Sequence, residues 1–220
     1  VDNIQSNLSL MRTFFQNIDA LKEEFYHSDN ILMSLSRSLE AKDLCTKEHS
    51  IRVSNLSADF VSYLGLSETV SEDVRRAGLI HDIGKIFLST SLLRKPDVLT
   101  EAEKEAIKSH VVLGEKICKP LVSTRRILPA IRNHHERWDG KGFPDALQGD
   151  DIPFIARILA IVDSFDAIVS ERCYSGCKSA QGALETMKSE QYTGQWDPEL
   201  LGYFLEMMSL IEKNIYKSNG

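Results

Sequence analysis

The segment 79–86 places a histidine and an aspartate, His81 and Asp82, next to each other in an apolar run, followed by Lys85. Adjacent ionisable side chains are costly to bury in apolar surroundings unless something binds them. A divalent metal is a suitable partner, because neutral imidazole and carboxylate are both good ligands. The alternative is a helix end at which Asp82 caps the helix and His81 packs in the core. Taken alone, the segment predicts one of these two arrangements.

Further ligand-type residues fall at the apolar faces or ends of other predicted helices. One lone histidine on such a face is usually a core residue, but the chain has six histidines, and five of them follow this pattern. Two aspartates, Asp163 and Asp166, are also embedded in an apolar helix. Seven ligand groups exceed what one ion accepts, so we expect two metals bridged by Asp82. The candidate ligands are His49, His81, Asp82, His110, His134, His135 and Asp163.

Two neighbouring metals would hold a shared hydroxide and the oxygens of a phosphoryl group, which is the chemistry of phosphoester hydrolysis. Lys85 lies four residues after His81 and would reach over the same site. Its ammonium group could neutralise a phosphate oxygen as negative charge develops. The alternative for Lys85 is a solvated lysine at a helix end. We therefore predict Asp82 and Lys85 as the catalytic residues.

The hydrophobic periodicity predicts an all-α fold, and no strand, internal repeat or low-complexity tract is recognisable. Ser67 and the pair Thr100 and Glu103 are expected to cap helix starts, and Gly65 a helix end. The expected helices span residues 1 to about 40, 46–65, 67 through 82, 100 to about 120, 123 to about 135 and 153–170, with two more beginning at Ser179 and Pro198.

The first helix carries apolar residues from Ile4 to Ile18 at alternating spacings of four and three, as in a coiled-coil seam. It is either a dimerising, signalling helix or an amphipathic helix that lies on the domain's own core. The first reading predicts a homodimer and an upstream sensor or receiver domain. Because residue 1 is Val and not Met, we expect the chain to be part of a longer or processed protein.

Composition excludes several classes of protein. The net charge of −6 argues against a protein that binds DNA or RNA duplexes, which usually carries a basic face. No apolar run approaches the roughly 20 residues that span a bilayer, so no membrane contact is expected. The four cysteines are scattered and form no CxxC pair, which is typical of free thiols in a reducing cytoplasm.

The order of these motifs resembles a known family. His81-Asp82, with His49 upstream and Asp163 downstream, is similar to the HD phosphohydrolase superfamily. The added His110 and the segment 134–144 resemble its HD-GYP branch, with a resemblance that runs from about residue 39 to 210. It implies an HD-domain helical bundle extended by C-terminal HD-GYP helices, formed by residues 39–220, with residues 1–38 as a separate N-terminal helix.

The resemblance implies a metal-dependent phosphodiesterase that opens cyclic di-GMP to linear pGpG, GMP or both, through a hydroxide that bridges two metals. Iron or manganese is the expected metal, with nickel, magnesium and zinc as further candidates. The first metal would be held by His49, His81, Asp82 and Asp163, and the second by Asp82, His110, His134 and His135. The resemblance also implies a set of substrate contacts, which are Lys85, Gly142, Phe143, Pro144, Asp166 and Arg172.

Three positions depart from the family pattern. Cys45 stands where some members have a glutamate that supports a third metal, so we expect two metals. Phe143 replaces the tyrosine that names the branch; a ring that can stack on a base remains, but the hydroxyl is lost. Ser175 replaces a basic residue, which removes one expected phosphate contact. These departures leave the expected metal ligands in place and reduce the expected contacts with substrate.

Three other functions remain open on the sequence. The reduced substrate contacts are compatible with a metal-loaded module that binds a cyclic dinucleotide and signals to a protein partner without useful turnover. The substrate could instead be another cyclic dinucleotide, such as cyclic GMP-AMP. A diiron oxygenase fits less well, because Lys85 and Arg172 are suited to phosphate.

Overall fold

The chain is a bundle of helices, and the residues that the structure describes contain no strand. The structure is a computed structural model that describes residues 30–34, 36–37, 48–170 and 179–218, with side chains up to residue 212. The predicted all-α class is confirmed. The helices are α2 (His49–Tyr63), α3 (Glu68–Ile80), η2 (Ile83–Phe87), α4 (Thr90–Leu93), α5 (Glu101–Lys108), α6 (His110–Cys118), η3 (Val122–Thr124), α7 (Leu128–Asn133), η4 (Gly149–Asp151), α8 (Phe154–Val169), α9 (Ala180–Ser189) and α10 (Pro198–Ser218).

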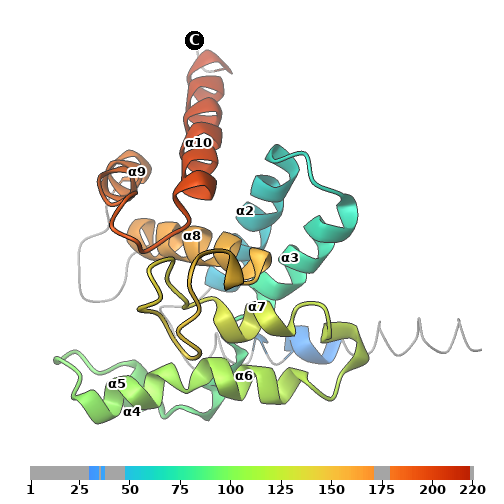
Figure 1. Cartoon of the computed structure of the whole chain (residues 1–220), viewed down its shortest axis with the longest axis vertical. Helices are drawn as coiled ribbons and strands as arrows, with labels where there is room; N and C mark the ends of the chain where they lie inside the picture. Colours follow the sequence, from blue (N-terminus) through green and yellow to red (C-terminus); the bar gives the residue numbers. More distant parts are fainter. Residues whose placement is uncertain (1–29, 35, 38–47, 171–178, 219–220) are drawn as a thin grey trace, which may run out of the picture.

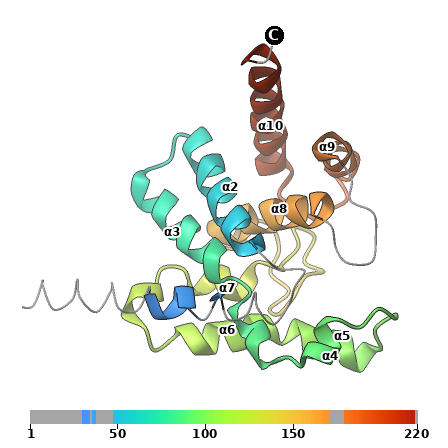
Figure 2. The same cartoon turned by 180° about the vertical axis from the view of Figure 1, so that it is seen from behind.

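Helices α2 and α3 form a hairpin against which α8 packs, and α10 projects from α8 and contacts α2 (Figures 1 and 2). Gly65 has a φ of 70° just after α2, where a left-handed residue ends the helix as expected. Ser67 occupies the N-cap of α3. Fully buried apolar side chains join these helices into one core, for example Val53, Phe60, Leu159 and Phe204.

Residues 30–34 and 36–37 are helical and lie on this same core. Leu32 is 3% exposed and belongs to the core cluster, and the Ser36 hydroxyl donates to the carbonyl of Leu79 at 2.9 Å. This end of the N-terminal segment therefore packs on the domain. The coiled-coil seam predicted from residues 4–18 lies outside the described residues, so the dimer stays a prediction.

The helix expected to run from Ser67 through Asp82 is shorter than predicted. α3 ends at Ile80, Asp82 has φ −93° and ψ 5°, and the tighter 3₁₀ helix η2 follows. The physical reason is a close crossing with α6 at Gly84, where an added Cβ would lie 1.9 Å from the carbonyl oxygen of His110. The turn aims Asp82 at α6, whereas a continuous α-helix would have placed its side chain about 100° round the axis from that of His81.

The helices expected around residues 100–135 are also divided. The capping box of Thr100 and Glu103 is confirmed, but α5 ends at Lys108 and α6 begins at His110. The Ser109 hydroxyl donates to the carbonyl of Ala106, a backbone acceptor of the helix end. Pro129 lies in the first turn of α7, because proline has no N–H to donate inside a longer helix.

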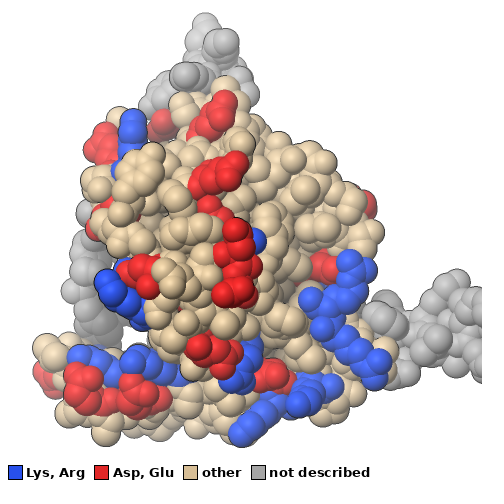
Figure 3. All heavy atoms as spheres, in the orientation of Figure 1, with Lys and Arg blue, Asp and Glu red and all other residues tan. Residues whose placement is uncertain are grey.

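Charged side chains of both signs share the surface in Figure 3, where acidic groups form a band down the middle of the face. This mixed surface agrees with the net charge of −6. Among the described residues, no helix has both the length and the apolar character needed to cross a membrane.

Candidate metal centre

The seven predicted ligands meet in the middle of the bundle as two adjacent clusters. One cluster joins the start of α2, the end of α3 and the middle of α8 through His49, His81 and Asp163. The other joins Asp82 with His110 at the start of α6 and with His134 and His135 at the end of α7. In each cluster, one possible ligand atom per residue lies within 4.8 Å of the others. Each cluster has the donor set and the size of a metal site.

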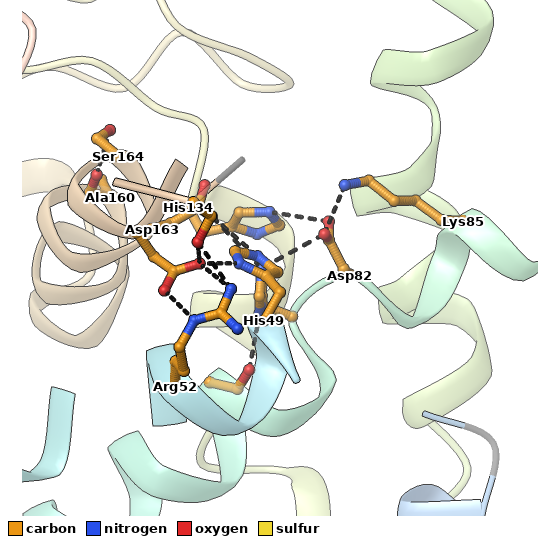
Figure 4. Close-up of polar contacts among 12 residues, drawn as sticks. His49, Arg52, Asp82, Lys85, His134, Ala160, Asp163 and Ser164 are labelled. Carbon is orange, nitrogen blue, oxygen red and sulfur yellow. Dashed lines mark hydrogen bonds and ion pairs between the residues drawn. The ribbon is translucent and has the colours of Figure 1, made fainter. Parts of the chain in front are cut away.

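The Asp82 carboxylate belongs to the second cluster but also reaches His81 of the first, and Lys85 lies on its other side (Figure 4). Its Oδ1 lies 3.2 Å from Nε2 of His110 and 4.0 Å from Nε2 of His134. Its Oδ2 lies 3.5 Å from Nε2 of His81. Nε2 of His81 is in turn 3.9 Å from Oδ1 of Asp163, which lies 3.2 Å from Nε2 of His49. Each oxygen of Asp82 therefore faces a different cluster, as a bridging ligand requires.

Three histidines are fixed so that Nε2 points into the centre. The Nδ1 atoms of His81, His110 and His134 lie 2.8, 2.6 and 2.9 Å from backbone carbonyls three residues earlier. A carbonyl can only accept, so Nδ1 carries the proton and Nε2 keeps its lone pair. Metal-bound histidines are commonly held in this way.

Two buried atoms in the centre, Nε2 of His81 and Oδ1 of Asp82, have no hydrogen-bond partner among the residues that the structure describes. Leaving such groups unpaired in the interior costs free energy, which a bound cation would offset. The residues present therefore fit divalent metal ions.

Burial keeps most of these histidines neutral. It lowers the pKa of His81, moves that of His134 well below its usual range and lowers that of His135 to about 4. Burial would raise the pKa of Asp82, but the positive charge of Lys85 outweighs it, so the pKa falls well below its usual range and the carboxylate stays ionised. Neutral imidazoles and an anionic carboxylate are the forms that bind metals.

His49 differs from the other histidines. Burial alone would lower its pKa, but hydrogen bonds to Asp163 and Asp166 raise it to about 9. Its Nδ1 lies 2.7 Å from Oδ2 of Asp166, which is 3% exposed. Arg52, one turn after His49, donates to both oxygens of Asp166 at 2.6 and 2.9 Å. The sequence analysis missed Arg52, although its spacing of three from His49 on one helix was a usable signal.

Lys85 forms an ion pair with the Asp82 carboxylate from the first turns of η2. Its side chain is 22% exposed, so the ammonium group lies at the border between the metal centre and solvent. The structure places Lys85 beside Asp82 as expected, although through a 3₁₀ turn and not through a continuous α-helix.

The segment 136–147 folds back over the second cluster. The buried carboxylate of Glu136 accepts the backbone N–H groups of Asp145 and Leu147 at 2.7 and 3.2 Å. An added Cβ on Gly142 would lie 2.3 Å from the backbone nitrogen of Arg137, so only glycine fits there. The loop brings Phe143 onto His135, with ring centroids 5.0 Å apart and an interplanar angle of 28°. Glu136 had no role in the sequence analysis.

A polar pocket of about 60 Å³ opens beside the centre. It is lined by His135 and Asp163 from the clusters and by Ser164, Gln195 and Trp196. Trp196 closes one side, since its indole N–H donates to the Ser164 hydroxyl at 3.1 Å. This volume would hold a few water molecules next to the candidate ligands. The predicted substrate contact Arg172, and the departures Cys45 and Ser175, lie outside the described residues.

Comparison with known proteins yields one family match. The profile of the family described as HD domain matches residues 33–200. The chain is 35% identical over 198 residues to a cyclic di-GMP phosphodiesterase of Thermotoga maritima, covering 86% of this chain and 53% of that protein. It is 32% identical over 196 residues to 3'3'-cGAMP-specific phosphodiesterase 2 of Vibrio cholerae, covering 87% of this chain and 37% of that protein. The chain thus spans about half the length of these relatives or less.

A solved structure shares the fold. The crystal structure of a cyclic GMP-AMP specific phosphodiesterase of Vibrio cholerae superposes with a TM-score of 0.63 at 20% identity. The superposition covers 86% of this chain and 50% of that one.

Proposed function

The chain belongs to the HD domain family, and from that membership we propose that it is a metal-dependent phosphodiesterase that hydrolyses cyclic di-GMP to linear pGpG, GMP or both. The observation that carries the proposal is the position of Asp82, whose two oxygens face two separate clusters of ligands. The motifs that resemble the HD-GYP branch and the Thermotoga maritima relative support this substrate. The proposed metals are two ions of iron or manganese, with nickel, magnesium or zinc as alternatives.

Bound ions would supply an activated water as nucleophile and would polarise the phosphoryl oxygens. The chain's own residues hold and orient that chemistry. Asp82 stays ionised and spans the clusters, while the carbonyls behind His81 and His110 keep each Nε2 unprotonated and directed inward. Lys85, paired with Asp82 here, would turn its ammonium group to a phosphate oxygen of the substrate.

The test combines metal analysis with a product assay. We expect anaerobically purified protein to contain about two ions per chain and to convert cyclic di-GMP into linear products. Asp82→Ala should abolish turnover and reduce the metal content, whereas Asp59→Ala, which removes an exposed carboxylate of α2, should behave as wild type. Retained turnover in Asp82→Ala would overturn the mechanism.

A second substrate is favoured by one observation. A relative of similar identity is named as specific for 3'3'-cGAMP. We therefore propose cyclic GMP-AMP as the alternative substrate. A competition assay with one protein preparation decides which of the two cyclic dinucleotides is preferred. The preferred dinucleotide should inhibit turnover of the other at a lower concentration than is needed for the reverse inhibition. If both bind tightly without turnover, the chain is instead a binding module that signals to a partner.

Partners and location are further parts of the proposal. We propose a homodimer formed through residues 1–38, an upstream sensor or receiver domain, and action in the cytoplasm. The coiled-coil spacing of residues 4–18 and the scattered cysteines support these three expectations. Analytical ultracentrifugation of the full chain and of a chain that starts at residue 30 tests the dimer, since only the full chain should sediment as a dimer.

A further inference from the structure

Two of the candidate ligand histidines are held differently from the rest. His81, His110 and His134 are fixed by backbone carbonyls three residues earlier. His49 and His135 have no such carbonyl contact among the described residues. Since misoriented ligands weaken metal binding, each of these two rings needs another support. The structure provides a different support in each cluster.

His49 is supported by Asp166. Oδ2 of Asp166 lies 2.7 Å from Nδ1 of His49 and also accepts from Arg52 at 2.9 Å and from Ser170 at 3.1 Å. Oδ1 accepts from Nε of Arg52 at 2.6 Å. Both oxygens of a carboxylate that is 3% exposed are therefore already used. Asp166 has little hydrogen-bonding capacity left for a substrate, but it fixes the imidazole ring of His49, which faces Asp163.

His135 is supported by Phe143. Their rings stack with centroids 5.0 Å apart, and the Phe143 N–H donates to the carbonyl of His135 at 3.3 Å. Within the described part of the chain, no hydrogen bond reaches a ring nitrogen of His135. The other ring neighbours of His135 are the candidate ligands His110 and His134, with centroids 5.1 and 4.2 Å away, so Phe143 is the described ring from outside the ligand set that supports this imidazole. The stack also occupies one face of the Phe143 ring.

We propose that Asp166 and Phe143 are positioning residues of the metal centre, one for each cluster, and not contacts of the substrate. Asp166 orients His49 in the first cluster, and Phe143 orients His135 in the second. This assignment differs from the one that the HD-GYP resemblance implies. It rests on the two-metal centre of the proposed function but not on the identity of the substrate.

The test measures Mn²⁺ binding to metal-free protein, by elemental analysis after equilibrium dialysis and by electron paramagnetic resonance of the ion pair. Asp166→Ala and Phe143→Leu should each lower the affinity for one of the two Mn²⁺ ions by about 10- to 100-fold, which is the usual effect of losing a residue that orients a metal ligand. Phe143→Tyr keeps the ring and should retain both ions. Phe87→Leu, which removes a phenyl ring that is 64% exposed, is the matched control and should bind as wild type.

Steady-state kinetics at saturating Mn²⁺ separate positioning from substrate contact. If the proposal holds, the KM for the cyclic dinucleotide stays within about twofold of wild type once both ions are bound. Unchanged Mn²⁺ affinity together with a raised KM in Asp166→Ala and Phe143→Leu would overturn it. If either variant does not fold, Arg52→Gln and Phe143→Met test the same two supports with smaller changes.

The same measurements test this inference and the proposed function separately. A wild-type chain that binds two ions but hydrolyses no cyclic dinucleotide contradicts the proposed function, and the Mn²⁺ affinities of the variants still decide the inference. A wild-type chain that binds fewer than two ions overturns the inference. Hydrolysis with unchanged Mn²⁺ affinity in the variants leaves the function in place and overturns the inference alone.

Discussion

Gly84 sets the distance between the residues that form the second cluster. It lies in the 3₁₀ turn after Asp82, and its Cα faces the backbone of α6 so closely that a Cβ would lie 1.9 Å from the His110 carbonyl oxygen and 2.6 Å from the Gly114 nitrogen. Neither of these atoms belongs to a flexible side chain. The absence of a side chain at one position is what lets Asp82 reach His110 at 3.2 Å.

We therefore expect Gly84→Ala to lower the free energy of unfolding by about 3 kcal/mol or more, because backbone and not a side chain has to move. The same shift should separate Asp82 from His110 and reduce the metal content. Gly202→Ala, in the second turn of α10, is the control, since only the end of the Gln191 side chain would lie near the added Cβ, at 3.4 Å. That variant should gain roughly 0.5–1 kcal/mol. Urea unfolding of both variants measures whether the free energy of unfolding falls in Gly84→Ala and rises in Gly202→Ala.

His49 makes metal binding depend on pH in one cluster only. Its pKa in the metal-free chain is raised from 6.5 to about 9, so the stability that its proton contributes is complete below pH 6.5 and is lost as pH rises toward 9. A metal must displace that proton, so the affinity of the first cluster should fall about tenfold for each pH unit below 9. His135, with a pKa of about 4, predicts a flat response for the second cluster.

Anaerobic Mn²⁺ titrations at pH 6.5, 7.5 and 8.5 measure both affinities. Equal pH slopes for the two ions would contradict the assignment of the raised pKa to His49. Asp166→Asn removes one of the three carboxylates that raise this pKa, so the affinity of the first cluster should depend less steeply on pH over the same range.

At the scale of the elements, α5 is held in place by its first turn. The Thr100 hydroxyl accepts the N–H of Glu103, whose carboxylate accepts the N–H of Thr100 and binds Lys95 at 2.8 Å. We expect Thr100→Ala to destabilise the protein by about 1 kcal/mol, as for other N-caps. Thermal unfolding at neutral pH measures it, and Thr100→Ser, which keeps the hydroxyl, should restore most of the loss.

Acid should weaken the same turn. Hydrogen bonds from Lys95 and from Thr100 lower the pKa of Glu103 from 4.5 to about 2. A lowered pKa in the folded state contributes stability that is complete above pH 4.5 and is lost as pH falls toward 2. Glu103→Gln should therefore reduce the difference in stability between pH 5 and pH 3. An unchanged difference would show that the capping box contributes nothing to acid sensitivity.

The helix boundaries show which features sequence patterns predict and which they do not. Apolar stripes correctly predicted an all-α chain, and the pair Thr100 and Glu103 correctly predicted the capping box, because both signals depend on residues a few positions apart. The breaks at Asp82 and Ser109 were missed. The first depends on a contact with another element, Gly84 against α6, and at the second the Ser109 hydroxyl donates to the carbonyl of Ala106. For the same reason as the first break, the contact of Asp166 with His49, which lies 117 residues earlier, was not predicted from the sequence.

At the scale of the whole molecule, the candidate ligands connect α2, α3, α6, α7 and α8, which are most of the central bundle. Six of the seven ligands lie at helix ends, and Asp163 lies inside α8. Helix ends move apart more easily than helix centres. Ions shared between helix ends would therefore cross-link the parts of the bundle that packing constrains least. The metals should therefore stabilise the fold as a whole and not only the site.

Removal of the metal tests this cross-linking. Binding to the folded state alone contributes about 4 kcal/mol when the free ion is about 1,000 times its Kd, which for a chain of this size is on the order of 10 °C in Tm. We expect chelation to lower Tm by that amount and Mn²⁺ to restore it. Asp163→Asn should reduce the change in Tm, because the first metal keeps only the bridging Asp82 as an anionic ligand, while Asp59→Ala should leave the change as in wild type. An unchanged Tm after verified removal of the ions would mean that packing alone holds the five helices together and that the clusters add no stability.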